Sequence, residues 1–339
     1  MRPNRRVKVA AQQCQRIALF LREQGLVPKT YATLEGASPD LPPDRLTDYY
    51  FFLSMLLFDF KGMEAQIGGR VLHGADLFFA LARRRAEVEP DFFTSSRLAE
   101  ITTEELAAVF SLDGSPGNTL LPRCQERGEI LRDGAARLLS GYRGSARELL
   151  DASEGYLHRR QGMGLLDTLA DFRGYLDPHF KKAFVLLKFL SAQGHYAIKD
   201  DKENLYIPVD YHLLRVALRS GMVDVCESGL ERKLKERQEA SPGEEDEVRE
   251  AVKLAYKEVE KASDLDVFRL DEIFWTLGRS CCHYSRPPRC SQCDRSGCSV
   301  MESFHVTCPG RCLISPVCRG ARDGSYQAFF EPAITTIFY

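Results

Sequence analysis

The chain has 339 residues, enough for one large domain or two smaller ones with proper cores. Its composition, 44% hydrophobic and 28% charged, is that of an ordinary globular protein, and no apolar run reaches the roughly 20 residues of a membrane helix. The net charge of −2 argues mildly against a nucleic-acid partner, but an acidic segment (226–272, 15 acids and 9 bases) is set against a basic one (279–323, 7 arginines and 3 acids), which permits a DNA-facing surface.

In chain order, the sequence reads as helical nearly throughout, without convincing alternation of apolar and polar residues. The start, MRPNRRVKVAAQQCQRIALFL, has basic residues before an apolar stretch, as a signal peptide would, but glutamines interrupt that stretch. We therefore expect an ordinary first helix and a cytoplasmic protein. Residues 47–60 and 73–88 predict core helices, and TTEELAAVF opens with a capping box at Thr102 or Thr103. We therefore predict an all-α fold.

The stretch LDPHFKKAFVLLKFLSAQG, from residue 176, predicts a buried helix. Asp177 and Pro178 are the expected N-cap and first-turn pair, and the residues after Lys182 are apolar almost all round. Lys181 and Lys182 fall in the first turn, where a positive charge opposes the helix dipole. Such placement suggests that the site requires an amine.

A second buried helix is predicted by IPVDYHLLRVALRSGMV, with Asp210 as its N-cap and Gly221 as its end. Together with FKKAFVLLKFL and LDEIFWTLGR, this motif resembles the helix-hairpin-helix DNA glycosylases, and among them the archaeal 8-oxoguanine glycosylase/lyases. The resemblance implies that Lys181 is a Schiff-base nucleophile, with Lys182 its competitor, and that Asp210 is the catalytic carboxylate.

A second resemblance covers more of the chain. The segments FDFKG, GADLFFAL, LLPRCQERGEILRDGAARLLSGYRGS, FKKAFVLL and TTIFY are similar to the queuosine-salvage proteins. That likeness implies an all-helical enzyme that releases queuine from queuosine 5′-phosphate, again with Asp210 as the catalytic aspartate. Both resemblances imply cleavage of an N-glycosidic bond.

Glycosylases hold a base between flat side chains, and charge on the sugar must be stabilised as the base departs. Phe58, Phe60 and Trp275 are candidate walls of such a pocket, and Lys182 is a further candidate for substrate binding. A carboxylate near C1′ stabilises the positive sugar and activates water, which is the role expected of Asp210. Core packing is the alternative role for the aromatic residues.

Eight of the eleven cysteines lie within 38 residues, and such a cluster without a secretory signal indicates a metal site rather than disulfides. They are Cys281, Cys282, Cys290, Cys293, Cys298, Cys308, Cys312 and Cys318. LGRSCCHYSRPPRCSQC resembles the iron-sulfur loop of the endonuclease III and adenine glycosylase families, which implies a [4Fe-4S] cluster.

Two ligand sets remain open for that cluster. Cys282, Cys290, Cys293 and Cys298 approximate the spacing of those families, whereas Cys308, Cys312 and Cys318 form a rival set. Eight thiols are also enough for a cluster and an additional Zn site. The arginines between the ligands are candidate phosphate contacts to DNA: Arg286, Arg289 and Arg295.

The sequence thus predicts three regions: an N-terminal helical lobe (1–150), a glycosylase core (151–280) and a Cys-rich metal loop with the tail (281–339). The favoured function is excision of a modified purine from damaged DNA, with lyase activity if Lys181 attacks. The alternatives are a hydrolase acting on a queuosine-like nucleotide and a non-catalytic nucleic-acid-binding metalloprotein.

Overall fold

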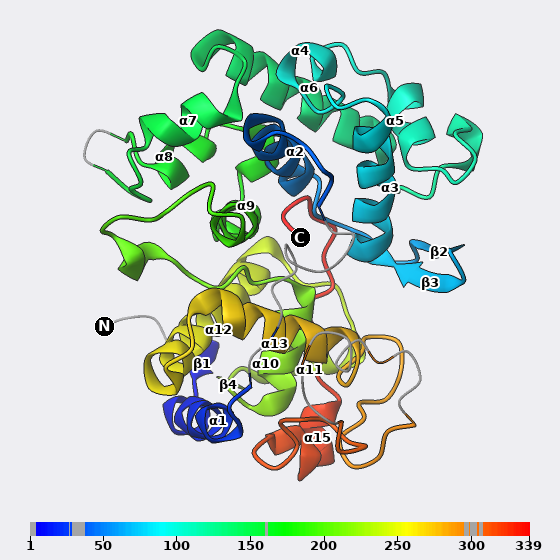
Figure 1. The fold of residues 1–339 in the computed structure, drawn as a ribbon. Helices are drawn as coiled ribbons and strands as arrows, with labels where there is room; N and C mark the ends of the chain where they lie inside the picture. Colours follow the sequence, from blue (N-terminus) through cyan, green and yellow to red (C-terminus); the bar gives the residue numbers. More distant parts are fainter. Residues whose placement is uncertain are drawn as a thin grey trace. The chain divides into compact units, whose positions relative to one another are not determined.

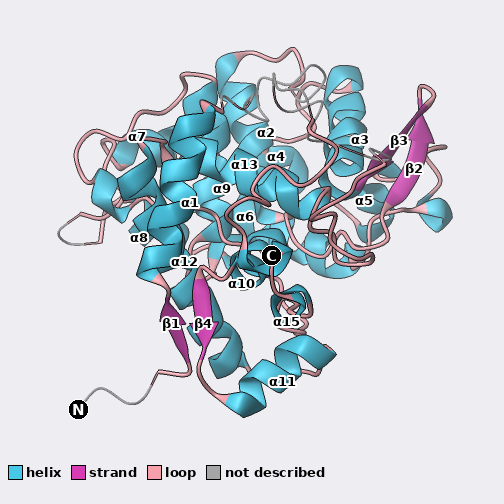
Figure 2. Ribbon diagram, turned by 90° about the horizontal axis from the view of Figure 1, so that it is seen from below, coloured by secondary structure: helices cyan, strands magenta, loops and turns pink. Residues whose placement is uncertain are grey.

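The computed structural model of the protein describes residues 5–26, 28, 38–159, 162–294, 298, 304 and 308–339. The chain divides into two compact units. Met1–Thr30 and Tyr206–Thr335 form what we call the terminal unit, and Tyr31–Leu205 with Thr336–Tyr339 form the middle unit. These boundaries differ from the divisions at residues 150 and 280 expected from the sequence. Helices dominate both units, which confirms the all-α prediction (Figure 2).

The middle unit is built around helix α2 (Pro43–Met55), whose residues 49–53 are buried on every side. Helix α2 packs against α6, α7, α9 and the short 3-10 helix η3 (Figure 1). The core helix predicted over residues 47–60 is therefore confirmed as far as Met55, and residues 56–60 lie outside it. The other elements of this unit are α3 (Gly74–Val88), α4 (Ser95–Leu98), α5 (Thr103–Val109), η2 (Pro116–Asn118), α6 (Cys124–Gly141), α7 (Ala146–Ala152), α8 (Leu165–Leu169), η3 (Arg173–Tyr175), α9 (Lys181–Ala192) and η4 (Lys202–Asn204).

The middle unit also contains a β-hairpin that the sequence reading missed. Strands β2 (Glu64–Ile67) and β3 (Arg70–His73) pair antiparallel, with Glu64 opposite His73. Gly68 and Gly69 join them with φ values of +57° and +80°, a region that glycine adopts more readily than any other residue. The Gly-Gly pair was the available signal, but the strands are mostly exposed and too short for a clear alternation.

Helix α9 begins later than predicted. Its first residue is Lys181 rather than Pro178, and Phe180 precedes it in the left-handed conformation with φ of 55°. The carboxylate of Asp177 accepts hydrogen bonds from the backbone N–H groups of His179 (3.0 Å) and Lys181 (2.9 Å). Asp177 therefore forms a tight turn before the helix, because an aspartate can hydrogen-bond the backbone two residues on as well as cap a helix.

The terminal unit is organised around α10 (Tyr211–Ser220), which packs against α12 and α13. Asp210 is its N-cap and Gly221 ends it in the left-handed conformation, as predicted. The capping box of α5 is likewise confirmed at Thr102 and Glu105. The remaining elements of the terminal unit are β1 (Val7–Val9), α1 (Ala11–Gln24), β4 (Val223–Val225, antiparallel to β1), α11 (Ser228–Glu236), α12 (Pro242–Ser263), α13 (Val267–Arg279), η5 (Arg319–Ala321) and α15 (Gly324–Gln327).

None of the helices that the structure describes has the length and apolar character needed to cross a membrane.

Candidate functional site

The Asp210 carboxylate lies at the N-terminus of α10, in the terminal unit. Its Oδ1 atom accepts hydrogen bonds from the backbone N–H groups of His212 (2.8 Å) and Leu213 (3.0 Å), and the residue is 7% exposed. The positive end of the helix dipole favours a negative group at this position. Asp210 is thus a helix cap, and its carboxylate is held in a fixed orientation by two backbone donors.

A buried histidine stands beside this carboxylate. Burial, and next the charge of Arg215, lowers the pKa of His212 well below its usual value. The guanidinium of Arg215 donates to Nδ1 of His212 at 3.1 Å, so the ring accepts at that nitrogen and stays neutral. Arg215 in turn forms an ion pair with Glu331 at 2.7 Å. Sequence reasoning had not singled out this pair, which joins α10 to a residue 116 positions further along the chain.

Trp275, a predicted pocket wall, belongs to the same neighbourhood. Its ring lies edge-on to the ring of His212, with 6.2 Å between centroids, and the guanidinium of Arg279 stacks over it at 4.2 Å. Helix α13 therefore places the flat side chain of Trp275 beside His212, in the first turn of α10. This arrangement brings Asp210, His212 and Trp275 into one part of the terminal unit.

Lys181 and Lys182 lie in the middle unit, where both amines serve the end of another helix. Nζ of Lys182 donates to the carbonyl of Met55 at 2.6 Å, and Nζ of Lys181 donates to the carbonyl of Leu57 at 2.9 Å. Helix α2 ends at Met55, and the carbonyls at a helix C-terminus lack partners within the helix and carry its negative end, whereas Leu57 lies in the coil just beyond the C-cap. The two amines are therefore explained by the C-terminus of α2, although they oppose the dipole of their own helix.

Lys182 and Arg127 form a buried cationic cluster around Phe58. Nζ of Lys182 lies 4.5 Å from the ring centroid of Phe58. The guanidinium of Arg127, a residue of α6, lies 4.1 Å from the same centroid. Burial, and next the charge of Lys181, lowers the pKa of Lys182 well below its usual value, and burial lowers the pKa of Arg127 to about 10. Arg127 donates to the carbonyls of Phe58 and Pro122.

Phe60 is also part of the core of the middle unit. Its ring packs against Phe78 with 4.9 Å between centroids, and the residue is 8% exposed.

Arg127 was not among the predicted site residues, although a signal existed. It shares a helical face with Ile130, Leu131 and Leu138, all of which are buried, so an arginine interrupts an apolar stripe.

The predicted site residues are therefore distributed over both units. Asp210 and Trp275 belong to the terminal unit, whereas the other predicted catalytic and substrate-binding residues belong to the middle unit: Phe58, Phe60, Lys181 and Lys182. Helices α9 and α10 fall in different units, so their expected helix-hairpin-helix pairing stays a prediction.

The Cys-rich region lies in the terminal unit, and all eleven cysteines of the chain are free thiols. Five of the predicted ligands line one small cavity: Cys281, Cys282, Cys290, Cys312 and Cys318. Cys308 is buried, and Cys293 and Cys298 are half-buried. Within the described ranges, no three Cys, His, Asp or Glu side chains are arranged to hold a single metal ion.

The arginines of this region interact with their own loop. Arg286 donates to the carbonyl of Ser280 at 3.3 Å. Arg289 pairs with Asp294 at 3.1 Å and lies 3.4 Å from the sulfur of Cys293. Their predicted contacts to phosphate are not tested by these interactions. Arg295 lies outside the described residues.

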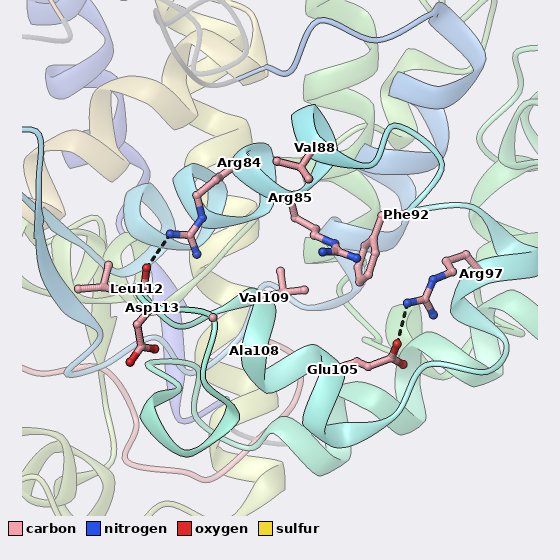
Figure 3. Close-up of a pocket in the computed structure, with 11 residues that line it drawn as sticks. Arg84, Arg85, Val88, Phe92, Arg97, Glu105, Ala108, Val109, Leu112 and Asp113 are labelled. Carbon is pink, nitrogen blue, oxygen red and sulfur yellow. Dashed lines mark hydrogen bonds and ion pairs between the residues drawn. The ribbon is translucent and has the colours of Figure 1, made fainter.

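The middle unit also has a surface pocket of about 450 Å³ between α3 and α5 (Figure 3). Three arginines line it, and each has an acceptor: Arg84 binds the carbonyl of Leu112, Arg97 binds Glu105, and Arg85 binds Glu89. The guanidinium of Arg85 also stacks over Phe92 at 4.4 Å. The described residues that line this pocket include none of the predicted catalytic or substrate-binding residues.

Comparison with known proteins gives one informative similarity. The chain is 25% identical over 259 residues to the queuosine 5′-phosphate N-glycosylase/hydrolase of Sphaerobacter thermophilus, a match that covers 70% of this chain and 77% of that protein. No protein-family model matches the chain. The similarity agrees with the longer of the two resemblances found in the sequence.

Proposed function

We propose that the protein is an N-glycosylase that hydrolyses the bond between base and sugar in a nucleoside 5′-phosphate of the queuosine type. The observation that carries this proposal is the similarity over 70% of the chain to an enzyme named for that reaction. The near-neutral net charge of −2 also suits a small substrate better than a DNA duplex. Damaged DNA, the partner favoured by the sequence alone, receives no support from the comparison.

The chemistry assigned to Asp210 follows from the charge that develops on the sugar. As the C1′–N bond breaks, the base leaves with the bonding electrons and the sugar becomes positively charged. A fixed carboxylate stabilises that charge and takes a proton from the attacking water. The water oxygen then bonds to C1′, and the base takes up a proton. The two backbone donors of α10 hold the Asp210 carboxylate in one orientation, which supports this role.

Hydrolysis is favoured over a Schiff-base route. A lysine nucleophile must present a neutral amine to C1′. Nζ of Lys181 donates to the carbonyl of Leu57 instead, and Lys182 is engaged in the same way at Met55. Both amines would have to leave the end of α2 before they could attack. We therefore assign the two lysines to positioning of α2 and assign the reaction to water.

The direct test is release of free base from nucleoside 5′-phosphates, including queuosine 5′-phosphate, followed by mass spectrometry. Asp210→Asn should lower kcat by about 10²- to 10³-fold, the usual effect of removing one group that stabilises a transition state. A matched control exists in the same unit: Asp266 caps α13 through Oδ1, which accepts from Phe268 and Arg269 at 3.0 Å each. Asp266→Asn should leave kcat unchanged.

Two outcomes would contradict the proposal. Equal activity of Asp210→Asn and wild type would remove the catalytic role of the carboxylate. Absence of base release from every nucleotide, together with DNA binding that weakens steeply as salt rises, would support a nucleic-acid-binding protein instead. Borohydride trapping separates the two chemical routes, because only a Schiff base gives a covalent adduct with the protein.

A further inference from the structure

The surface pocket between α3 and α5 has no role in the proposed reaction. It lies within the middle unit, and its volume of about 450 Å³ falls in the range of small-molecule sites. Its walls come from the last turns of α3, the coil that follows, α4, and α5 with the loop after it. The described residues of these walls include none of those assigned to base release, so a ligand held there would have a separate site.

Part of the pocket is apolar. Val88 and Leu112 line it with 76% and 47% of their surfaces exposed, which is unusual for large hydrophobic side chains. Val109 and the ring of Phe92 add buried apolar surface, and Figure 3 shows Val109 between Arg84 and Arg97. An apolar ligand group would remove the exposed side chains from water, which favours binding.

Two of the three arginines in the pocket are neutralised by acids. Nη2 of Arg97 pairs with Glu105 at 2.7 Å, and its Nε lies 3.3 Å from Glu89. Arg85 pairs with the other oxygen of Glu89. Both guanidiniums also lie over the ring of Phe92, at 4.4 Å for Arg85 and 5.1 Å for Arg97. This side of the pocket is therefore fixed and carries no surplus charge.

Arg84 differs from these two arginines. It donates to the backbone carbonyls of Ser111 (2.5 Å) and Leu112 (3.0 Å), and among the described residues it forms no ion pair with a carboxylate. The nearby acid of the wall, Asp113, accepts hydrogen bonds at 2.9 and 2.7 Å from its own loop instead. A guanidinium has five N–H donors, so two carbonyls leave donors of Arg84 for a ligand.

We propose that this pocket binds a small organic carboxylate, whose anionic end pairs with Arg84 and whose apolar body covers Val88, Val109 and Leu112. The planar fork of a guanidinium matches a carboxylate, and one surplus positive charge matches a single negative one. A phosphate monoester would bring a second negative charge close to Asp113. The proposal is independent of the N-glycosylase activity, because binding is measured without base release.

The test uses the full chain and a matched pair of probes, γ-phenylbutyrate and γ-phenylbutyramide, which share an apolar body and differ in charge. Calorimetry measures the dissociation constants, and NMR shifts of the backbone amides locate the site. We expect γ-phenylbutyrate to bind with a dissociation constant on the order of 1 mM, about tenfold more tightly than the amide. The shifts should fall within residues 84–114. Absence of saturable binding, or shifts confined to other residues, would overturn the proposal.

Arg84→Gln removes the charge and keeps the apolar wall. The variant should bind γ-phenylbutyrate about tenfold more weakly and the amide as wild type does, because only a charge-assisted hydrogen bond is lost. Arg83→Gln is the matched control, since Arg83 is the preceding residue of α3, pairs with Glu87 at 2.6 Å and is not among the lining residues. It should change neither constant. Equal effects of the two substitutions would contradict the role of Arg84.

Ala108→Leu tests the apolar part. Ala108 is half-buried on α5 and lines the pocket, so the larger side chain should fill the space and weaken binding of both probes several-fold. Unchanged binding in a variant that circular dichroism shows to be folded would place the probes elsewhere. Inorganic phosphate should displace γ-phenylbutyrate poorly. Displacement at equal concentration would show that the site recognises charge alone, which would overturn the proposed ligand class.

Discussion

The two units bury charge in different ways. In the terminal unit, two fully buried arginines have carboxylate partners: Arg215 pairs with Glu331 at 2.7 Å, and Arg249 pairs with Glu245 at 3.4 Å. In the middle unit, Lys182 and Arg127 are as deeply buried, yet they bind backbone carbonyls and the ring of Phe58. Among the described residues, neither of these two forms an ion pair with a carboxylate.

This difference indicates where the charge is structural. A buried pair is stable because each ion neutralises the other, so removing one partner leaves the other uncompensated. A single buried ion lowers stability unless hydrogen bonds replace its water shell. In the middle unit, the buried amines of Lys181 and Lys182 replace part of that water shell by donating to the carbonyls of Leu57 and Met55, at and just beyond the end of α2. Neutralising one partner of these two ion pairs should therefore destabilise the terminal unit, whereas neutralising an unpaired buried charge should spare or stabilise the middle unit.

The largest effect is expected for Glu331→Gln in the terminal unit. The side chain of Arg215 is fully buried and that of Glu331 is 8% exposed, so the substitution leaves a buried guanidinium without its counter-charge. Loss of one partner of such a pair costs about 3–5 kcal/mol. Urea denaturation at neutral pH measures the change in the free energy of unfolding. A loss below about 1 kcal/mol would show that the pair is screened as surface pairs are.

An effect of opposite sign is expected for Asp48→Asn in the middle unit. Burial raises the pKa of Asp48 from 3.8 to about 6, although the N–H of Ala146 donates to its Oδ1 atom at 2.9 Å. The nearest cation, Arg45, is 3.9 Å away and 42% exposed, so it neutralises the carboxylate poorly. Because the folded state holds the proton more tightly than the unfolded state, stability falls as pH rises from about 4 to about 6.

Asparagine keeps the acceptor for Ala146 and removes the charge. At neutral pH the variant should be about 2–3 kcal/mol more stable than wild type, the free energy that corresponds to a pKa difference of about two units. The gain should vanish near pH 4, where the wild-type carboxyl is also protonated. Urea denaturation at the two pH values measures both terms. A variant that is equally or less stable at neutral pH would contradict the assignment of Asp48 as an uncompensated buried charge.

Local signals in the sequence were sufficient for elements that depend on neighbouring residues. The caps of α10 at Asp210 and Gly221 and the capping box at Thr102 were predicted correctly, because a side chain and the backbone two or three residues away decide them. The start of α9 was wrong for a related reason. An aspartate can cap a helix or form a turn through the backbone N–H groups that follow it. Asp177 forms the turn, and the helix begins only after Phe180.

Long-range partners could not be read in the same way. The amines of Lys181 and Lys182 bind carbonyls more than 120 residues away, so the sequence showed two unexplained charges and not the helix end that they satisfy. The cysteine cluster was visible by its density, but the spacing left two ligand sets open. The cavity includes members of both sets, because the coil before η5 folds back onto the end of α13.

The smallest effect is expected for Lys182→Met. Methionine keeps much of the side-chain volume and removes a buried amine, but it leaves the carbonyl of Met55 without that donor. These opposing terms should nearly cancel, giving a change in unfolding free energy on the order of 1 kcal/mol. That is well below the loss expected for Glu331→Gln. A loss as large as in that variant would show that Lys182 is charged and compensated, which would remove the contrast between the units.

The pH dependence of the Lys182→Met variant gives the sharper test. The pKa of Lys182 is lowered by burial, so below the usual lysine pKa of about 10.5 the unfolded chain binds a proton that the folded chain resists. Wild-type stability should therefore rise, relative to the variant, as pH increases toward the usual lysine pKa of about 10.5. The difference between the two proteins isolates Lys182, because other groups that titrate in this range are common to both. Parallel curves would mean that folding leaves the proton affinity of Lys182 unchanged.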